Sequence, residues 1–548
     1  MTRHLIAIFL LTILAFPTVK DLFQPGAYTS HDLTHHIVRA IHMDKLLGQG
    51  QFPPRWTDEL NYGYGYPLFI FMYPLPPIMA VGIHRLGFDY IWSGKLVLAL
   101  SMVLSAVFAY IFFAYLWRNR RAGFVSALFY LYAPIRFLNV YVSATFGNAV
   151  AFMFVPLSFY ALVKAKRGEA TKISTLVGAL SLAGLMLSHN IMALMFLPII
   201  GLFGLLLLIN ARHKLLVASH YALIAILGLG LSAWFWLPAT LEKRLLRYDT
   251  TLVGFYQTHF PTLSQLIHSP WGYGFSHPGT ELDAMSFQIG LAHLLVVALS
   301  LAILFLKRKT NWFFLGLFFI SVFFMLQISD PLWKTIPFLP YLQMPWRLLA
   351  VTVFAASALA GYVVINLPAP TLSALLLSLA VIVANRNHWR INQVFDPGED
   401  YYLAINNTTT MASEHLPQGA DKFDDFPPPS AKLEFLTGQG KISYPINTAI
   451  AVKANIAADT TNQMRFNQIY FSGWHYWLDD QPLGVDFKPN RPLPQFSVSP
   501  GTHIFSAQLT RTPVRQLADI ISLVALIGAI IYGLTPTFGG FSHLQRSR

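Results

Sequence analysis

Apolar runs of about twenty residues recur along this chain and limit what it can fold into. A helix of that length is roughly 30 Å long, which matches the hydrocarbon core of a bilayer. Only 11% of the 548 residues are charged and 55% are hydrophobic, whereas an ordinary soluble domain has about 25% charged residues. These observations exclude a water-soluble enzyme and predict an all-α, multi-pass membrane protein.

We expect about twelve membrane-spanning helices. Their predicted ranges are 4–20, 94–117, 122–141, 149–163, 174–188, 191–210, 215–237, 286–306, 312–327, 346–365, 370–385 and 515–535. A further apolar stretch, 67–86, is also long enough to cross, but Pro67, Pro74, Pro76 and Pro77 disfavour a plain helix at its start. A crossing there would also invert every later loop. We therefore predict an interfacial or re-entrant helix at 67–86.

The basic residues indicate the orientation in the membrane. They cluster in short segments between apolar runs: Arg3; Arg118, Arg120 and Arg121; Lys164, Lys166, Arg167 and Lys172; Arg212 and Lys214; Lys307, Arg308 and Lys309; Arg546 and Arg548. All lie on one side of the twelve-span arrangement, so the positive-inside rule places both termini in the cytoplasm. The net charge of +13 therefore reports membrane orientation, and we expect no nucleic-acid partner. No small-x-small cleavage site precedes Lys20, which favours a retained first span over a cleaved signal peptide.

Three segments are expected outside the cytoplasm, at 21–93, 238–285 and 386–514. The last is polar, and short runs of alternating polar and apolar residues in it predict a β-sandwich-like domain. We expect a transmembrane domain over 1–385, an extracytoplasmic β-rich domain over 386–514, and a final helix with a cytoplasmic tail over 515–548. The chain has no cysteine, which excludes disulfides, thiolate chemistry and iron–sulfur clusters.

Candidate catalytic side chains follow the first apolar run. If 32–47 is helical, Asp32, His35, His36 and Arg39 share one face of that helix. A carboxylate beside imidazoles at a membrane surface can act as a general base toward a hydroxyl or take part in a metal site. Asp32 also suits the simpler role of a helix cap, with interfacial histidines beside it. Spacing alone leaves both interpretations open.

Several motifs together resemble those of the GT-C superfamily of polyprenyl-phosphate-dependent glycosyltransferases. They are His31-Asp32 with His35, Gln51-Phe-Pro-Pro-Arg55-Trp56, Gly63-Tyr-Gly-Tyr-Pro-Leu-Phe69, Ser188-His189-Asn190, Met344-Pro-Trp-Arg347-Leu-Leu349, Glu414-His-Leu-Pro417 and Tyr470-Phe-Ser-Gly-Trp474. Within that superfamily the chain looks most like the membrane proteins labelled 6-pyruvoyl-tetrahydropterin synthase-related. The similarity extends from residue 1 to the final span, although each motif alone is weak.

The resemblance implies a catalytic aspartate in the first outer loop, which corresponds to Asp32. It also implies sugar transfer from a lipid phosphate with inversion, and it leaves a divalent cation, Mg²⁺ or Mn²⁺, open as a cofactor held by Asp32. The superfamily's second acidic position is Asn148 in this chain. An amide binds a sugar hydroxyl but cannot act as a base or supply ligand charge. This departure leaves a two-carboxylate metal site in doubt.

The remaining candidates are assigned by position. We expect His31 and His35 to act beside Asp32, and we expect substrate contacts from six residues: His36, Arg55, Asn148, His189, Arg347 and Glu414. Arg347 opens a span at the outer face, where a guanidinium can hold two phosphate oxygens, although a membrane anchor beside Trp346 fits as well. His189 equally fits a helix-end histidine bonded to backbone, and Glu414 a solvated surface carboxylate.

The favoured function is an integral membrane glycosyltransferase of the bacterial inner membrane. Its expected partners are a polyprenyl-phosphate-linked sugar donor, an extracytoplasmic glycan, lipid or protein acceptor, and membrane lipid. Two alternatives stay open: a flippase or transporter of a lipid-linked saccharide, and a non-catalytic scaffold for envelope assembly. Ion-coupled transport is disfavoured because the spans contain few ionisable residues besides His220, His293 and Asp519.

Overall fold

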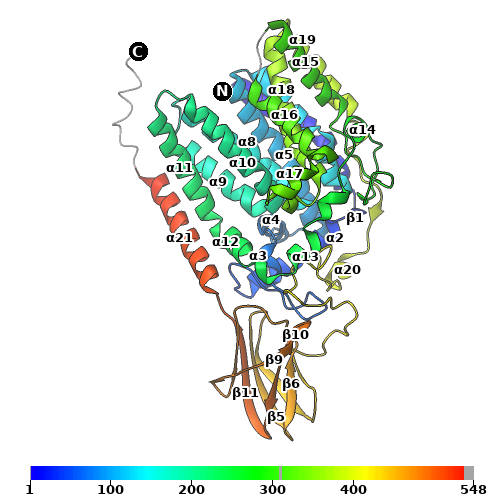
Figure 1. Ribbon diagram of the computed structural model, residues 1–548, viewed down its shortest axis with the longest axis vertical. Helices are drawn as coiled ribbons and strands as arrows, with labels where there is room; N and C mark the ends of the chain where they lie inside the picture. The colour runs from blue at the N-terminus through cyan, green and yellow to red at the C-terminus, as the bar shows by residue number, and fades with distance from the viewer. Residues whose placement is uncertain (1, 308–310, 536–548) are drawn as a thin grey trace.

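The computed structural model describes residues 2–307 and 311–535. A helical body lies at one end of the long axis and a strand-rich domain at the other (Figure 1). The start of α1 and the end of α21 lie at the helical end, away from the strands. The basic residues Arg308, Lys309, Arg546 and Arg548, used above for orientation, lie outside the described residues.

Each of the twelve predicted spans contains a helix. The helices are α1 (Thr2–Ala15), α5 (Tyr90–Trp117), α6 (Arg120–Leu131), α8 (Phe146–Lys166), α9 (Lys172–Ser188), α10 (Asn190–Ile209), α11 (Lys214–Leu231), α15 (Leu291–Lys307), α16 (Trp312–Met325), α18 (Leu349–Asn366), α19 (Pro370–Ala384) and α21 (Pro513–Leu534). Several are extended by short turns or helices: η1 (Phe16–Thr18), α7 (Pro134–Phe137), the π-helical turn η3 (Leu138–Val142), α12 (Ala233–Leu241) and η8 (Pro345–Leu348).

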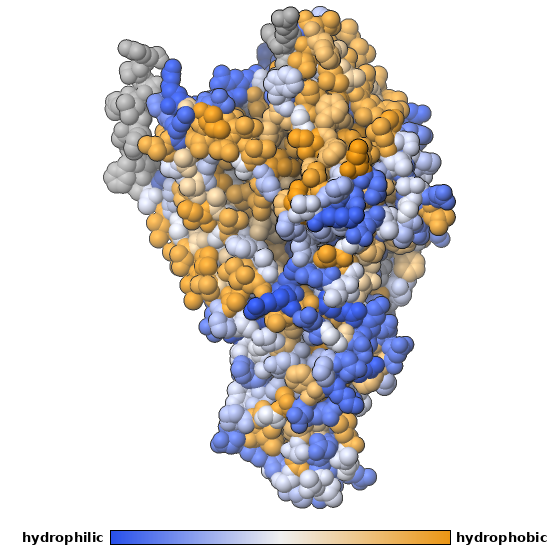
Figure 2. Space-filling model, viewed as in Figure 1, coloured by the Kyte–Doolittle hydropathy of each residue, from blue (hydrophilic) through white to orange (hydrophobic). Residues whose placement is uncertain are grey.

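Among the described residues, length and composition identify six helices able to cross a membrane, or eight if each of two bent pairs is one span. The bent pairs are Arg120–Leu131 with Pro134–Val142, at 48°, and Trp312–Met325 with Gln327–Thr335, at 87°. Apolar side chains cover the helical body and give way to polar ones over the strand-rich end (Figure 2). The multi-pass helical architecture is therefore confirmed for the described residues, whereas the expected count of twelve is not, because α1, α9, α15 and α19 are short.

The apolar stretch at 67–86 forms two short helices, α3 (Leu68–Phe71) and α4 (Leu75–His84). The ten residues of α4 extend about 15 Å, half of a hydrocarbon core. α4 packs against α2 (Leu33–Gly48) and α5. This geometry agrees with a segment that does not cross.

Close helix packing forms the core of the body, where α5 lies between α6 and α8. A glycine permits one close contact: a Cβ at Gly123 of α6 would come within 2.5 Å of the Ala114 backbone on α5. Side chains larger than hydrogen there would push the two helices apart. This packing fixes where both ends of α5, α6 and α8 lie.

The strand-rich domain is a sandwich of two antiparallel sheets, as the alternation predicts. One sheet has the order β3 (Leu433–Phe435), β6 (Asn462–Phe466), β10 (Arg491–Val498), β9 (Asp486–Lys488); the other has β4 (Gly440–Asn447), β5 (Ala451–Ala458), β11 (Gly501–Leu509), β7 (Trp474–Leu478), β8 (Gln481–Pro482). The sheets meet through Phe505, whose ring lies 4.9 Å from Phe496 and 5.6 Å from Phe466. Trp474 and Tyr476 are buried in the same core, so this aromatic pair is structural.

The strand-rich domain starts later than the predicted boundary at 386. The preceding segment packs on the helical body: β2 (Val394–Phe395) pairs with β1 (Ala27–Tyr28), and α20 (Glu399–Leu403) contacts α2. The remaining short elements lie in loops: η2 (Lys20–Phe23), η4 (Lys243–Leu245), α13 (Tyr248–Leu252), η5 (Phe255–Thr258), α14 (Leu263–Ile267), η6 (Gln327–Ser329), α17 (Asp330–Thr335) and η7 (Leu339–Leu342). Polar composition alone did not separate loop from sandwich, because both are solvent-accessible.

Candidate functional site

Asp32 is held where the start of α2 meets the turn after η3. It is the residue before the first turn of α2. The backbone N–H groups of His31 and Asp32 donate to the carbonyls of Val142 and Ser143, each at 3.0 Å. These bonds tie the start of α2 to the turn after η3, where Ala144 adopts φ +50°. The start of α2 and the turn after η3 are far apart in the sequence, but together they form one rigid corner.

The carboxylate of Asp32 does not cap its own helix, which removes the simpler interpretation offered by the sequence. No side-chain capping hydrogen bond forms at Asp32. Within residues 2–307 and 311–535, no hydrogen bond or ion pair engages its carboxylate. Asp32 instead lines a cavity of about 300 Å³ at the end of the helical body nearest the sandwich. An acceptor-only group facing a cavity is available to take a proton from a ligand.

The cavity gathers most of the predicted site. Its lining includes His31, Asp32, His36, Asn148, His189, Arg347 and Glu414. His35 lies in the first turn of α2, three residues after Asp32, but its ring is not part of the lining. Arg55 lies elsewhere, with its Nη2 2.6 Å from Asp519 of α21. Its motif joins the first outer loop to the sandwich, because neighbouring Trp56 packs edge-on against Trp474 at 5.4 Å.

Two guanidinium groups give the cavity its cationic side. Arg347 lies in η8, and its Nη1 is buried without a hydrogen-bond partner in the described structure. Arg39 lies in α2, two helical turns beyond Asp32, where its Nε donates to the Thr409 hydroxyl at 3.3 Å and its Nη2 to the Thr409 carbonyl. Arg39 is therefore committed to holding a loop, whereas Arg347 has a free donor. A buried donor of this kind favours an anionic ligand such as a phosphate oxygen.

The histidines around Asp32 are neutral at neutral pH. Burial lowers the pKa of His31 and His35, and burial together with the Arg39 charge lowers the pKa of His36 well below its usual range. The His31 Nε2 lies 2.9 Å from the Gly274 carbonyl, and its ring stacks on Phe275 at 4.1 Å. Bonding to a carbonyl requires a proton on that nitrogen. His31 thus anchors the second outer segment over the cavity.

His189 is a helix-end histidine bonded to backbone, and it also lines the cavity. It follows the last residue of α9 and its Nδ1 accepts from the Met192 N–H of α10 at 3.2 Å. Burial lowers its pKa to about 3, so the ring is neutral and the remaining proton is on Nε2. The ring lies 4.9 Å from Tyr73 and lines the cavity. Gly147 permits this packing, since a Cβ there would lie 2.5 Å from the His189 ring.

A loop of the third outer segment brings in Glu414 and His415. Tyr66 donates its hydroxyl proton to the Thr408 carbonyl, and Arg39 holds Thr409. These bonds position Glu414, whose Oε2 accepts the Ala412 N–H at 3.1 Å. Glu414 is buried at 9% exposure rather than solvated. Both Glu414 and His415 line the cavity.

The sequence prediction missed many of the lining residues, among them Tyr73, Gln343 and Tyr248. Tyr73 follows the Gly-Tyr-Gly-Tyr motif, and Gln343 directly precedes the Met-Pro-Trp-Arg motif, so both lay within reach of recognised patterns. Gln343 adopts φ +66°, a conformation that costs free energy outside glycine, and donates to the Tyr248 hydroxyl at 2.9 Å. No sequence signal marked Tyr248, because its place depends on a long outer loop.

The side chains present do not fit a divalent cation. No group of three or more histidine, aspartate or glutamate side chains in the described part of the chain could hold a metal ion. Asn148 donates through Nδ2 to the Asn139 Oδ1 at 3.3 Å and brings no charge. The lining has two carboxylates and two guanidinium groups, Arg39 and Arg347. It therefore lacks the excess negative oxygen charge that Mg²⁺ or Mn²⁺ prefers.

Comparisons with known proteins give weak likenesses. No protein-family profile matches the chain. A protein of Lactococcus lactis subsp. cremoris (strain MG1363), described as an uncharacterized protein, is 25% identical over 244 residues, which cover 43% of this chain and 39% of that protein. The match therefore spans well under two thirds of that relative.

Among solved structures, the arabinofuranosyltransferase AftD from Mycobacteria (mutant R1389S) aligns with a TM-score of 0.44 and 13% identity over 71% of this chain and 28% of its own. ArnT from Cupriavidus metallidurans, bound to undecaprenyl phosphate, aligns at 0.36 and 13% over 69% and 63%. The Archaeoglobus fulgidus oligosaccharyltransferase aligns at 0.40 and 11% over 73% and 57%. At these values the likenesses assign no activity to this chain.

Proposed function

We propose that this protein is a membrane glycosyltransferase of the GT-C type that transfers a sugar from a polyprenyl-phosphate donor to an extracytoplasmic acceptor with inversion. The observation that carries the proposal is the unpartnered Asp32 carboxylate, which shares a cavity with the free donor of Arg347. A base for the acceptor and a cation for the leaving phosphate are the two groups that such a reaction requires.

The proposed reaction is a single displacement at the anomeric carbon. Asp32 accepts the proton of the acceptor hydroxyl while that oxygen forms a bond to the anomeric carbon. The bond from this carbon to the phosphate oxygen breaks on the opposite face, and its electron pair leaves with polyprenyl phosphate. Arg347 stabilises the charge that develops on the departing phosphate. Attack opposite the leaving group inverts the anomeric configuration.

Neutral groups of the cavity suit the sugar between these two charges. Neutral His189 offers an Nε2 proton, and Asn148 offers amide atoms to hydroxyl groups. The ring of His36 lines the cavity and stacks on Phe146, 4.5 Å away, which fixes its orientation. No reaction step requires a metal ion held by these side chains.

The proposed topology follows from the same arrangement. We propose twelve crossings with both termini in the cytoplasm of a bacterium, and the sandwich and the Asp32 cavity on the outer side of the inner membrane. α9 and α15, with 17 residues each, extend about 25 Å, which a locally thinned bilayer accommodates. A polyprenyl tail then stays in lipid while its phosphate reaches Arg347 at the outer end of α18.

The test measures transfer of radiolabelled sugar from a panel of polyprenyl-phosphate sugars to endogenous acceptors in membranes. We expect the Asp32→Asn variant to lose about 10²- to 10⁴-fold in rate, because the amide cannot take the proton. Asp425→Asn, the same change at an exposed position, is the matched control and should transfer like the wild type. Addition of EDTA should leave transfer unchanged.

Undiminished transfer by a folded Asp32→Asn protein would overturn the assignment of the base. An absence of transfer from every donor by the wild type would overturn the enzyme itself and favour a flippase or a scaffold. Loss of transfer with EDTA, restored by Mg²⁺ or Mn²⁺, would contradict the metal-independent reaction.

A further inference from the structure

A second and larger hollow lies at the opposite end of the helical body. Its volume is about 850 Å³, and it is bounded by the ends of α1, α5, α6 and α8. None of its lining residues lies in the Asp32 cavity. The proposed reaction makes no use of this hollow.

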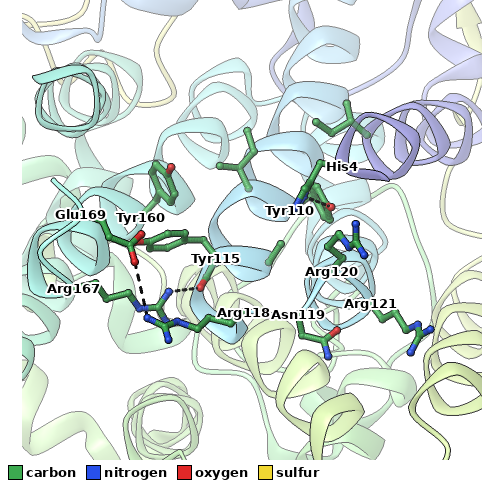
Figure 3. Close-up of a pocket in the computed structure, with 13 residues that line it drawn as sticks. His4, Tyr110, Tyr115, Arg118, Asn119, Arg120, Arg121, Tyr160, Arg167 and Glu169 are labelled. Carbon is green, nitrogen blue, oxygen red and sulfur yellow. Dashed lines mark hydrogen bonds and ion pairs between the residues drawn. The ribbon is translucent and has the colours of Figure 1, made fainter. Parts of the chain in front are cut away.

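The hollow is strongly cationic on one side (Figure 3). Four arginines line it, and one glutamate is the only acid among them: Arg118, Arg120, Arg121, Arg167 and Glu169. Tyrosines at 110, 115 and 160 and His4 add polar atoms. A cavity with this composition is complementary to an anion that carries several oxygen acceptors, such as a phosphate group.

Part of the lining is engaged in building the wall. Arg167 donates to the carbonyls of Tyr115 and Leu116, at 2.5 and 2.8 Å, and Tyr115 donates its hydroxyl proton to Glu169 at 2.6 Å. Glu169 is also 3.9 Å from Arg118. The single acid is therefore held on the Arg167 side of the hollow.

Arg120 and Arg121 have no such partners. Within the described chain neither guanidinium forms a hydrogen bond or an ion pair, and Figure 3 accordingly draws no dashed line to them. Both lie in the first turn of α6, after the cap Asn119, where positive charge opposes the helix dipole. Both side chains are exposed, and an anion bound beside them would offset this unfavourable placement.

The remaining wall is apolar and continuous with the lipid-facing side of α1. Ile8, Ile111 and Ala114 line the hollow, and Leu5, Ile6 and Phe9 of α1 are exposed by 52 to 65%. A free phosphate has no apolar part that could pack against this wall, whereas a lipid has acyl chains that can. The hollow therefore combines a phosphate-binding side with a hydrocarbon-binding side.

We propose that this hollow binds the phosphate headgroup of an anionic membrane lipid in the leaflet opposite the Asp32 cavity. Basic pockets between membrane helices recognise such headgroups by charge and by bidentate arginine contacts. The positive-inside rule explains why arginines lie at this face. It does not explain why two of them line a hollow with an apolar wall.

The test measures binding to the full-length protein in neutral detergent, with short-chain phosphatidylglycerol as the probe. Short-chain phosphatidylcholine tests the requirement for net charge, and inorganic phosphate tests a soluble ligand. We expect saturable phosphatidylglycerol binding that weakens with salt, and at least about tenfold weaker binding of the other two probes. Equal binding of inorganic phosphate would overturn the lipid assignment.

Two pairs of substitutions locate the site. Arg120→Gln with Arg121→Gln should weaken phosphatidylglycerol binding by about 30-fold, and Arg120→Lys with Arg121→Lys should restore most of it. Arg212→Gln with Lys214→Gln removes two exposed charges from the loop between α10 and α11 at the same face and should change binding little. An equal loss in this control, or none in Arg120→Gln with Arg121→Gln, would overturn the proposal.

Discussion

At the scale of single residues, Arg347 distinguishes a phosphate-binding group from a membrane anchor. An anchor extends its guanidinium toward headgroups and water, whereas the Arg347 Nη1 is buried without a partner beside Asp32 and Tyr248. Its neighbour Trp346 is also buried, at 8% exposure, and packs on Phe287. This geometry favours the functional interpretation of the Met-Pro-Trp-Arg motif.

Substitution of Arg347 tests this interpretation through kinetics. We expect Arg347→Gln to lower kcat/KM by about 10²- to 10³-fold, since the developing phosphate charge loses its cation. Arg347→Lys should recover part of the loss, because it restores the charge without the bidentate contact. Transfer assays over a range of donor concentrations separate kcat from KM. Equal activity of Arg347→Gln and wild type would indicate an anchor.

Residues that share one helix or one motif were predictable, and residues brought in by distant loops were not. The face shared by Asp32, His36 and Arg39 follows from helical spacing alone. Arg55 was assigned to the substrate from its motif, yet it bonds to Asp519, which is 464 positions away. Pairings over such separations depend on how the elements assemble, and one sequence carries no record of that.

At the scale of elements, a buried ion pair attaches the last helix to the rest of the body. Glu242 follows α12, and its Oε2 lies 2.9 Å from Nε and 2.8 Å from Nη2 of Arg515 on α21. Thr512 donates to the other carboxylate oxygen. Arg515 is fully buried, whereas only 11% of the apolar stretch of α21 is buried by the rest of the protein. The pair therefore fixes the start of α21 where packing alone is sparse.

Removing one partner of this pair should destabilise the protein. Glu242→Gln leaves the Arg515 cation buried without a counter-charge, and we expect a loss of about 3 kcal/mol in the free energy of unfolding. Lys243→Gln breaks a more exposed pair with Asp249 and should cost less than about 1 kcal/mol. Thermal unfolding in detergent measures both. Equal melting temperatures for the two variants would contradict a buried-pair role.

Sequence periodicity located the helices but not how many of them can cross. Every predicted span contains a helix, because an apolar run without charges is a strong local signal. The run at 122–141 is instead broken into α6, α7 and the π-helical turn, with Pro134 at the break. This break forms the corner to which Asp32 is tied, so the departure from a regular span coincides with the candidate site.

At the scale of the whole molecule, buried neutral histidines link stability to pH. Burial lowers the pKa of His42 to about 4, despite Glu59 at 3.9 Å, and that of His189 to about 3. In the unfolded chain a histidine has a pKa of about 6.5. Below pH 6.5 the unfolded state therefore binds more protons than the folded state. Stability must decrease as the pH falls from 6.5 toward 4.

The size of this effect can be measured with one substitution. At pH 5 a histidine with a folded pKa of about 4 lowers the free energy of unfolding by on the order of 2 kcal/mol. We expect the melting temperature of the wild type in detergent to fall between pH 7.5 and pH 5. The melting temperature of His42→Gln should fall by a smaller amount, because this variant lacks one buried histidine. His277→Gln, at an exposed position, should follow the wild type. An identical fall in melting temperature for His42→Gln and wild type would contradict this prediction. It would show that His42 takes up its proton in the folded protein, with the surrounding loops relaxing around it.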